Sequence, residues 1–362
     1  MKNLTTVLDY QRAAAHKLGP GLMDYIQRTA GVGSAFRANL SAFDGYRILE
    51  APGSAQPVES IDTFVRGVDG AMAMPIMVAP TAFHKLFHPG GEAATYEAAR
   101  ALCTRFVISS FSTLSFREIG ENLSSAWYQL LMYRDLAIMK ASIDWATDSG
   151  CSAIVITIDA PEGCSMCKRD PSVPAVQFPK EMPLLPTDDG LQFADLDEYY
   201  AKYMPGRIIW PQLAQIVEYT SRTKEGRRVP VILKGAQSAS EIVRSAHIGA
   251  AGVIVSNHGG RQNDKAPATL DILATLSEDV KKMGMPIYLD GGIRTGADVF
   301  KAIALGARAV LVGRPILYGL AVDGAHGAFD ILGILENELQ QCMKDAGCAS
   351  LADITSDKVA KK

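Results

Sequence analysis

Apolar segments alternate with helical patterns along most of this chain, and this alternation limits the possible folds more than any other feature. Eight short apolar runs predict buried strands at residues 76–80, 106–110, 126–131, 153–159, 229–234, 252–257, 286–290 and 309–313. Amphipathic stretches between them predict helices at residues 135–149, 239–248, 269–283 and 297–305. Eight such repeats are typical of a (β/α)8 TIM barrel, an α/β fold whose active site is formed by the loops after the strands.

Polar residues stand at the ends of these eight strands, and in a barrel such strand ends meet at one face. They are Thr81, Ser110, Gln129, Asp159, Lys234, His258, Asp290 and Arg314. We therefore expect the functional site at this face.

The 362 residues fit one barrel domain with additions. Residues 1–70 carry helical signals at 7–18 and 21–29, which predict an N-terminal helical extension over the lower end or one flank of the barrel. Residues 161–211 are rich in proline and follow the fourth strand, so they predict a long active-site loop and a candidate lid. A solvated loop that contacts no ligand is the alternative.

The composition argues against several classes of partner. A net charge of −3 gives no basic surface for nucleic acid or an anionic membrane. The sequence shows neither a signal peptide nor an apolar run of membrane-spanning length. Six cysteines in a chain this long do not suggest a disulfide scaffold. These features predict a cytoplasmic protein with reduced thiols.

Cys164 and Cys167 have C-x-x-C spacing in the long loop. A thioredoxin-like context is missing, and no second pair or nearby histidine completes a metal site. We interpret the spacing as a coincidence and expect no bound metal.

The sixth predicted strand ends on the sequence SNHGGRQ at residues 256–262. Within it, His258 can hold or release a proton near neutral pH, and Arg261 can bind a carboxylate through two parallel hydrogen bonds. The glycines allow the backbone to approach a ligand closely. The segment therefore predicts a proton-transfer and anion-binding site, although a glycine-rich turn with a structural histidine is the simpler alternative.

Two more glycine clusters follow the last two strands: LDGGIR at residues 289–294 and LVGRP at residues 311–315. In barrels these two loops form a phosphate site, where backbone amides and a helix N-terminus donate to the anion. Arg294 and Arg314 add positive charge at the same end. The clusters predict a ligand that carries a phosphate, and turns without a ligand are the alternative.

These motifs resemble those of the FMN-dependent α-hydroxy-acid oxidase and dehydrogenase family, which includes glycolate oxidase, lactate oxidase and mandelate dehydrogenase. The resemblance extends over nearly the whole chain. It rests on APTA at residues 79–82, FHP at 87–89, Gln129, TID at 157–159, LKG at 233–235, SNHGGRQ at 256–262 and the two glycine clusters.

The resemblance implies that FMN is the cofactor, with its phosphate near the two glycine clusters and their arginines. The cofactor-binding residues that it implies are Pro80, Thr81, Ala82, Ser110, Gln129, Thr157, Lys234, Ser256, His258, Asp290, Gly291, Gly292, Arg294, Gly313 and Arg314. A homotetramer is implied as well. For His84 and His88, the family pattern suggests a structural or cofactor-adjacent role.

Oxidation of an α-hydroxy acid removes the hydroxyl proton and the equivalent of a hydride from the α-carbon, so it requires a base beside the hydroxyl. We predict that His258 is this base and that Asp159 orients its imidazole, although Asp159 could instead cap the strand end. Arg261 would bind the substrate carboxylate. Lys234 would offset the negative charge of the reduced flavin.

The sequence departs from the family around the substrate. Tyr25 aligns with a family tyrosine that binds the carboxylate, although packing alone would also explain it. Leu131 replaces a second family tyrosine, and Phe111 stands where tryptophan is often found. A second carboxylate-binding arginine is missing from its usual place, which Arg169 could fill only if the loop bulges. We therefore expect a substrate bulkier than glycolate.

Molecular oxygen is the expected electron acceptor, which would yield hydrogen peroxide, and a dehydrogenase with another acceptor stays possible. Two other functions remain open from the sequence. The first is an FMN-dependent oxidase of an amine, amino acid or modified metabolite, and the second is a phosphate-binding lyase or isomerase without redox chemistry.

Overall fold

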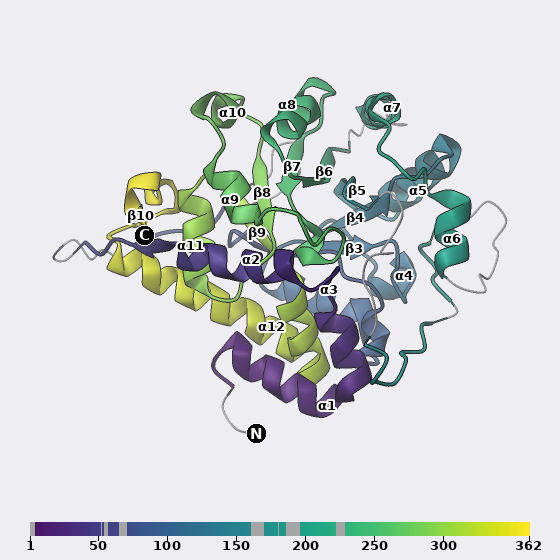
Figure 1. Cartoon of the computed structure of the whole chain (residues 1–362), viewed down its shortest axis with the longest axis horizontal. Helices are drawn as coiled ribbons and strands as arrows, with labels where there is room; N and C mark the ends of the chain where they lie inside the picture. Colours follow the sequence, from purple (N-terminus) through teal and green to yellow (C-terminus); the bar gives the residue numbers. More distant parts are fainter. Residues whose placement is uncertain are drawn as a thin grey trace.

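A closed barrel of eight parallel strands forms the centre of the protein (Figure 1). The computed structural model describes residues 4–51, 53, 57–64, 71–160, 170–179, 181–185, 196–221 and 229–362. The strands, in order around the barrel, are β2 (Ile76–Val78), β3 (Phe106–Ser109), β4 (Ala126–Leu131), β5 (Ala153–Thr157), β6 (Val231–Ala236), β7 (Gly252–Val255), β8 (Ile287–Asp290) and β9 (Ala309–Val312). Because β9 pairs with β2, the ring is complete and the predicted TIM barrel is confirmed.

Helices surround this barrel. They are α3 (Gly91–Ala101), α4 (Phe116–Ile119), α5 (Leu136–Asp148), α6 (Leu196–Tyr203), α7 (Trp210–Ser221), α8 (Ala239–His247), α9 (Thr269–Ala274), α10 (Glu278–Lys282), α11 (Gly296–Ala304) and α12 (Arg314–Asp345). The single helix predicted at residues 269–283 is wrong, because α9 ends at Ala274 and α10 starts anew. Ser277 explains the break, since its extended backbone and its side chain, which accepts from the amide of Val280, cap a new helix.

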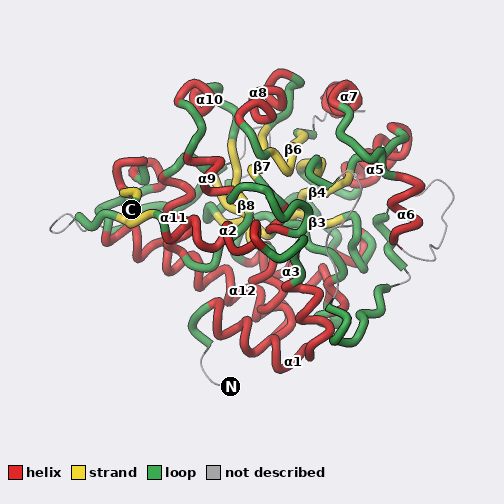
Figure 2. The backbone as a smooth tube through the Cα atoms, in the orientation of Figure 1, coloured by secondary structure: helices red, strands yellow, loops and turns green. Residues whose placement is uncertain are grey.

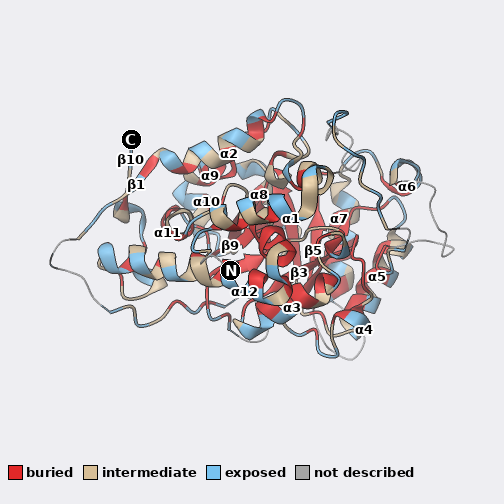
Figure 3. Cartoon of the chain, turned by 90° about the horizontal axis from the view of Figure 1, so that it is seen from below, coloured by how far each residue is buried: buried red, intermediate tan, exposed pale blue. Residues whose placement is uncertain are grey.

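Side chains of the strands point alternately into the barrel and toward the surrounding helices, and both sets are buried (Figure 3). Side chains that fill the interior include Met77, Val107, Trp127, Val155, Ile232, Ile254, Tyr288 and Leu311. Burial on both faces explains why the strands are continuous apolar runs and do not alternate with polar residues.

The N-terminal segment contributes to both ends of the barrel. Its elements are α1 (Val7–Gln27), which is broken at Gly19, α2 (Ser34–Asp44) and β1 (Tyr46–Ile48), which pairs antiparallel with β10 (Val359–Lys361). Met72 belongs to the interior cluster and covers the lower end of the barrel. The end of α1 and the whole of α2 lie instead at the face where the strands end, a position that the sequence did not predict (Figure 1).

Between β5 and α7, the described residues are loop except for the short helix α6 (Figure 2). This segment falls within the predicted active-site loop at residues 161–211. Within the described part of the chain, no helix has the length and apolar character needed to cross a membrane. The 3-10 turns η1 (His84–Leu86) and η3 (His258–Gly260) follow β2 and β7, and η4 (Leu351–Asp353) and η5 (Ser356–Lys358) precede β10.

Candidate active site

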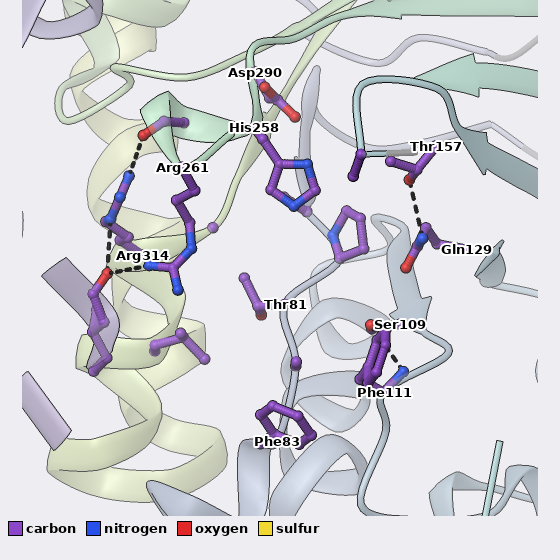
Figure 4. Close-up of a pocket in the computed structure, with 18 of the residues that line it drawn as sticks. Thr81, Phe83, Ser109, Phe111, Gln129, Thr157, His258, Arg261, Asp290 and Arg314 are labelled. Atoms are coloured by element: carbon purple, nitrogen blue, oxygen red, sulfur yellow. Dashed lines mark hydrogen bonds between the residues drawn. The ribbon is translucent and has the colours of Figure 1, made fainter. Parts of the chain in front are cut away.

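A cavity of about 630 Å³ opens at the carboxyl ends of the strands. In Figure 4, Arg261 and Arg314 lie on one side of it, Gln129 and Thr157 on the other, and His258 between them. The cavity brings together the predicted residues Tyr25, Pro80, Thr81, Ala82, Phe111, Gln129, Leu131, Thr157, Lys234, His258, Arg261, Asp290, Gly291, Gly292, Arg294, Gly313 and Arg314. The strand ends therefore converge as the barrel topology requires.

Three predicted residues lie outside this lining. Ser109 lines the cavity where Ser110 was expected, and Ser110 is fully buried. Ser256 and Asp159 do not line the cavity themselves. Ser256 forms a hydrogen bond with the lining residue Lys234, and Asp159 forms one with His258. Arg169, Cys164 and Cys167 lie outside the described residues, so the structure places none of them.

His258 and Asp159 form a hydrogen-bonded pair. The imidazole Nδ1 lies 3.1 Å from Asp159 Oδ1, and the Asp159 side chain is only 1% exposed. Since Asp159 occupies Nδ1, the ring nitrogen that remains for a ligand in the cavity is Nε2. The carboxylate therefore orients the imidazole and can stabilise its protonated form, as a base requires.

A second ion pair lies beside the first. Lys234 Nζ is 3.3 Å from Asp290 Oδ2 and donates to Ser256 Oγ at 3.1 Å. Burial alone would lower the pKa of Lys234, but the carboxylates of Asp290 and Asp159 raise it above its usual value. Burial would likewise raise the pKa of Asp159, but the charges of His258 and Lys234 hold it below its usual value. Lys234 is therefore a charged ammonium at the cavity wall.

The backbone at His258 adopts a conformation that few residues other than glycine take up, with φ of +58°. Ser256 Oγ accepts from the amide of His258 at 3.1 Å, and Asn257 Oδ1 accepts from the amide of Gly260 at 3.2 Å. These side-chain contacts hold the turn in shape, so the imidazole is fixed by its backbone as well as by Asp159.

Helix α2 supports this turn through Asn39. The side-chain amides of Asn39 and Asn257 form two reciprocal hydrogen bonds of 2.7 and 2.8 Å, both buried. Asn39 Oδ1 also accepts from the amide of Thr269. No signal in the sequence singles out Asn39, because the contact joins residues 218 positions apart.

Arg261 lies beside Tyr25 at the cavity wall. Its Nη1 donates to the carbonyl oxygens of Tyr25 and Arg28 at 3.0 and 2.9 Å, and its guanidinium lies 5.3 Å from the centre of the Tyr25 ring. The tyrosine ring packs in turn against Phe83 and Phe178. The end of α1 therefore positions the arginine that the sequence predicts as the carboxylate-binding group.

Arg294 and Arg314 lie at the glycine-rich end of the cavity. Burial lowers the pKa of Arg294, whose Nη1 donates to the carbonyl of Ile293 at 2.7 Å, and among the described residues it forms no salt bridge. A partly buried guanidinium that forms no salt bridge with a described carboxylate fits an anionic ligand. Gly291 and Gly313 line the same end, where backbone can approach that anion closely.

Gln129 and Thr157 present polar groups at the opposite side of the cavity. Gln129 Nε2 donates to Thr157 Oγ1 at 3.0 Å, and both side chains are nearly buried. Together with the Lys234 ammonium they suit the polar edge of a flavin ring, while the arginines suit a single phosphate. The donor set therefore fits FMN, with these residues holding its two ends.

The remaining wall is largely aromatic and apolar. Phe111 and Leu131 take the places predicted for them, and Phe83, Phe178 and Tyr200 join them. The ring of Phe83 lies 5.9 Å from that of Phe111, and Tyr200 lies 6.0 Å from Phe111. These three residues were not predicted. Phe83 and Phe178 lie in loops, which carry no periodic signal that shows which side chain faces a cavity, and Tyr200 lies in the short helix α6 within the long segment predicted as a loop.

Comparison with known proteins decides the family. A model of the FMN-dependent dehydrogenase family matches residues 14–361. The chain belongs to this family. It is therefore an FMN-dependent oxidoreductase, and the non-redox lyase or isomerase considered from the sequence is ruled out.

The chain is similar to several members with named activities. It is 36% identical to glycolate oxidase 2 of Oryza sativa subsp. indica, over 99% of this chain and 96% of the relative. It is 36% identical to L-lactate oxidase of a Roseobacter species, over 97% of this chain and 94% of the relative. A crystal structure of mandelate oxidase superposes with a TM-score of 0.84 at 30% identity, over 99% of both chains.

Proposed function

We propose that the protein oxidises 2-hydroxy acids to 2-oxo acids and prefers a side chain bulkier than that of glycolate. The His258–Asp159 pair, set in one cavity with Arg261, is the observation that carries this proposal. The related glycolate, lactate and mandelate oxidases support the same class of reaction. Bound FMN would supply the two-electron acceptor.

In this proposal His258 Nε2 accepts the proton of the substrate hydroxyl, and the resulting imidazolium is stabilised by the buried Asp159 carboxylate. Arg261 orients the substrate carboxylate through charge-assisted hydrogen bonds, together with Tyr25. Lys234 offers a fixed positive charge to the cofactor edge where negative charge accumulates. The glycine clusters with Arg294 and Arg314 hold the phosphate.

The apolar wall supports the preference for a bulkier acid. Phe111, Leu131, Phe83 and Phe178 surround the part of the cavity that a substrate side chain would occupy. Burial of an aromatic or long aliphatic group there contributes roughly 1.5–3 kcal/mol, or about one to two orders of magnitude in kcat/KM over glycolate. Arg169, predicted as a second carboxylate-binding arginine, has no described position that would support this role.

Reduction of the flavin by four acids tests the proposal. We expect the second-order rate constant for flavin reduction, measured as bleaching without oxygen, to be larger for mandelate and 2-hydroxyoctanoate than for lactate and glycolate. The highest value for glycolate would overturn the preference for bulk. If none of the four acids bleaches the flavin, an amine, amino acid or modified metabolite becomes the better substrate class.

Three further features belong to this proposal. Oxygen as acceptor predicts stoichiometric hydrogen peroxide in the aerobic reaction. A cytoplasmic location is supported by free thiols at Cys103, Cys151, Cys342 and Cys348, the cysteines that the structure describes. A homotetramer rests on the family resemblance, and light scattering during gel filtration would test it.

A further inference from the structure

A fully buried histidine lies next to the cofactor cavity, in the turn η1 that follows β2. Thr81, at the start of this loop, lines the cavity, whereas His84 is 0% exposed. The imidazole Nε2 lies 2.7 Å from Thr81 Oγ1, and Nδ1 lies 2.9 Å from Thr95 Oγ1 on α3. Both ring nitrogens are therefore engaged by hydroxyl groups.

His84 carries a single ring proton. Burial lowers the pKa of the imidazole, although the nearby Glu92 carboxylate opposes this shift. A neutral imidazole has one N–H donor and one nitrogen acceptor, so the two hydroxyl contacts must have opposite directions. Which nitrogen carries the proton follows from the surroundings of Thr95.

Thr95 is completely buried, and His84 Nδ1 is the one hydrogen-bond partner that the described residues offer its hydroxyl. A buried hydroxyl that left its proton unpaired would be unfavourable, so Thr95 donates to Nδ1. The imidazole proton is then on Nε2, and His84 donates it to Thr81 Oγ1. The hydroxyl of Thr81, having accepted this bond, retains its own proton for a further acceptor.

The side chain of Thr81 is placed between His84 and the phosphate end of the cavity. A Cβ built on Gly313 would lie 3.4 Å from Thr81 Cγ2, so the methyl group faces this glycine. Since Thr81 lines the cavity, its hydroxyl proton is available to an acceptor atom of a ligand bound there.

The turn that carries His84 is held rigidly. Glu92 is 0% exposed, and its carboxylate accepts from the backbone amides of His84 and Thr113, both at 3.0 Å, and from Thr113 Oγ1 at 2.5 Å. Phe83, directly before His84, has a left-handed φ of +63° that few residues other than glycine adopt. A strained backbone persists only where surrounding contacts determine it, and the contacts of Glu92 do so here.

We propose that His84 is a positioning residue that makes the Thr81 hydroxyl a hydrogen-bond donor to the cofactor in the cavity. This inference rests on the proposed placement of FMN in that cavity. His84 itself touches no ligand, and its effect reaches the cofactor only through Thr81.

A double-mutant cycle on the holoenzyme tests the proposal. Thr81→Val removes the hydroxyl, and His84→Met removes both ring nitrogens while filling the space of the ring. We expect each change to weaken FMN binding by roughly 2- to 10-fold, the effect of one lost hydrogen bond, and to shift the flavin reduction potential. The double variant should be no weaker than Thr81→Val alone, because His84 acts through that hydroxyl.

Rescue and control variants complete the design. His84→Gln retains an amide donor and a carbonyl acceptor, so it should restore FMN affinity and potential. His88→Gln changes a histidine that accepts from the amide of Gly90 and does not line the cavity, so it should leave both values unchanged. His84→Met leaves the Thr95 hydroxyl without its partner. If the variant fails to fold for this reason, the same cycle is measured in a Thr95→Val background, which lacks that hydroxyl.

Two outcomes would overturn the role of His84. One is a His84→Met protein with the affinity and potential of the wild type. The other is additive losses in the double variant, because additivity means that the histidine acts through packing and not through Thr81. A wild-type protein that binds no FMN would instead refute the proposed cofactor site.

Discussion

At the scale of single residues, the proposed reaction depends on how Asp159 holds His258. Asp159→Asn should lower the rate of flavin reduction by the substrate on the order of 10²–10⁴-fold, because an amide can neither stabilise the imidazolium nor enforce the same tautomer. Stopped-flow spectroscopy without oxygen measures this rate. Asp144→Asn is a matched control, since Asp144 also accepts hydrogen bonds, from Tyr219, but does not line the cavity. Equal loss in both variants would contradict the assigned role.

Because the pKa of Asp159 is lowered in the folded protein, its ionisation contributes to the free energy of unfolding in a pH-dependent way. A carboxylate whose pKa is lower in the folded than in the unfolded protein stabilises the fold above the unfolded value of about 3.9, and this contribution is lost as the pH falls through the folded value. The free energy of unfolding, measured with urea between about pH 3 and pH 6, should therefore depend less on pH in Asp159→Asn than in the wild type. An unchanged dependence would mean that Asp159 is not the group titrating.

The sequence could not predict that Ser109, and not Ser110, lines the cavity. Side chains along a strand alternate between its two faces. In β3, Val107 and Ser109 face the inside of the barrel, and Phe106 and Ile108 face the surrounding helices. Because residues of both sets are buried and Ser109 and Ser110 are the same residue type, the sequence does not reveal which set faces inward. His258, Arg261, Lys234 and Gln129 were predicted correctly as cavity-lining residues, since the carboxyl ends of the parallel strands of a barrel meet at one face.

At the scale of elements, β6 and the end of β5 approach each other closely at Gly235. Its φ is +114°, and a Cβ there would lie 2.7 Å from Asp159 Cβ and Cγ. Gly235→Ala should therefore destabilise the protein by about 1–3 kcal/mol and displace Asp159, which slows flavin reduction.

Gly284→Ala is the matched control for this prediction. Gly284 has a left-handed φ of +72°, but a Cβ would meet nothing within 4 Å, so the variant carries backbone strain without the clash. Urea unfolding measures the loss of stability in both variants, and stopped-flow spectroscopy measures the rate. The explanation fails if Gly235→Ala reduces flavin at the rate of the Gly284→Ala protein.

The elements themselves were largely predictable. All eight strands appear at the expected positions, because buried parallel strands give uninterrupted apolar runs between turn signals. The split of residues 269–283 into α9 and α10 was missed, since the amphipathic pattern continues across the break and only the capping geometry of Ser277 shows it. Short caps of this kind depend on local backbone conformation, which periodicity does not report.

At the scale of the whole molecule, the N-terminal extension completes the active site. Asn39 of α2 bonds to Asn257 beside the His258 turn, and a Cβ on Gly292 in the phosphate turn would lie 2.2 Å from the carbonyl oxygen of Asn39. One helix thus contacts both the turn that carries the proposed base and the turn proposed to bind the phosphate. The sequence could predict a helical extension but not this position, which is determined by tertiary contacts distant in the chain.

Asn39→Ala should therefore loosen both turns at once. It leaves the buried amide of Asn257 without its reciprocal partner, which destabilises the fold by about 1–3 kcal/mol and should also increase the release of FMN and slow flavin reduction. Thermal unfolding, FMN retention after gel filtration and stopped-flow reduction measure the three effects. Ser41→Ala, on the same helix, removes an exposed hydroxyl that donates to the carbonyl of Ala38 within α2, and it should change none of them. If Asn39→Ala lowered thermal stability but left FMN retention and the reduction rate at wild-type values, α2 would support the fold without organising the site.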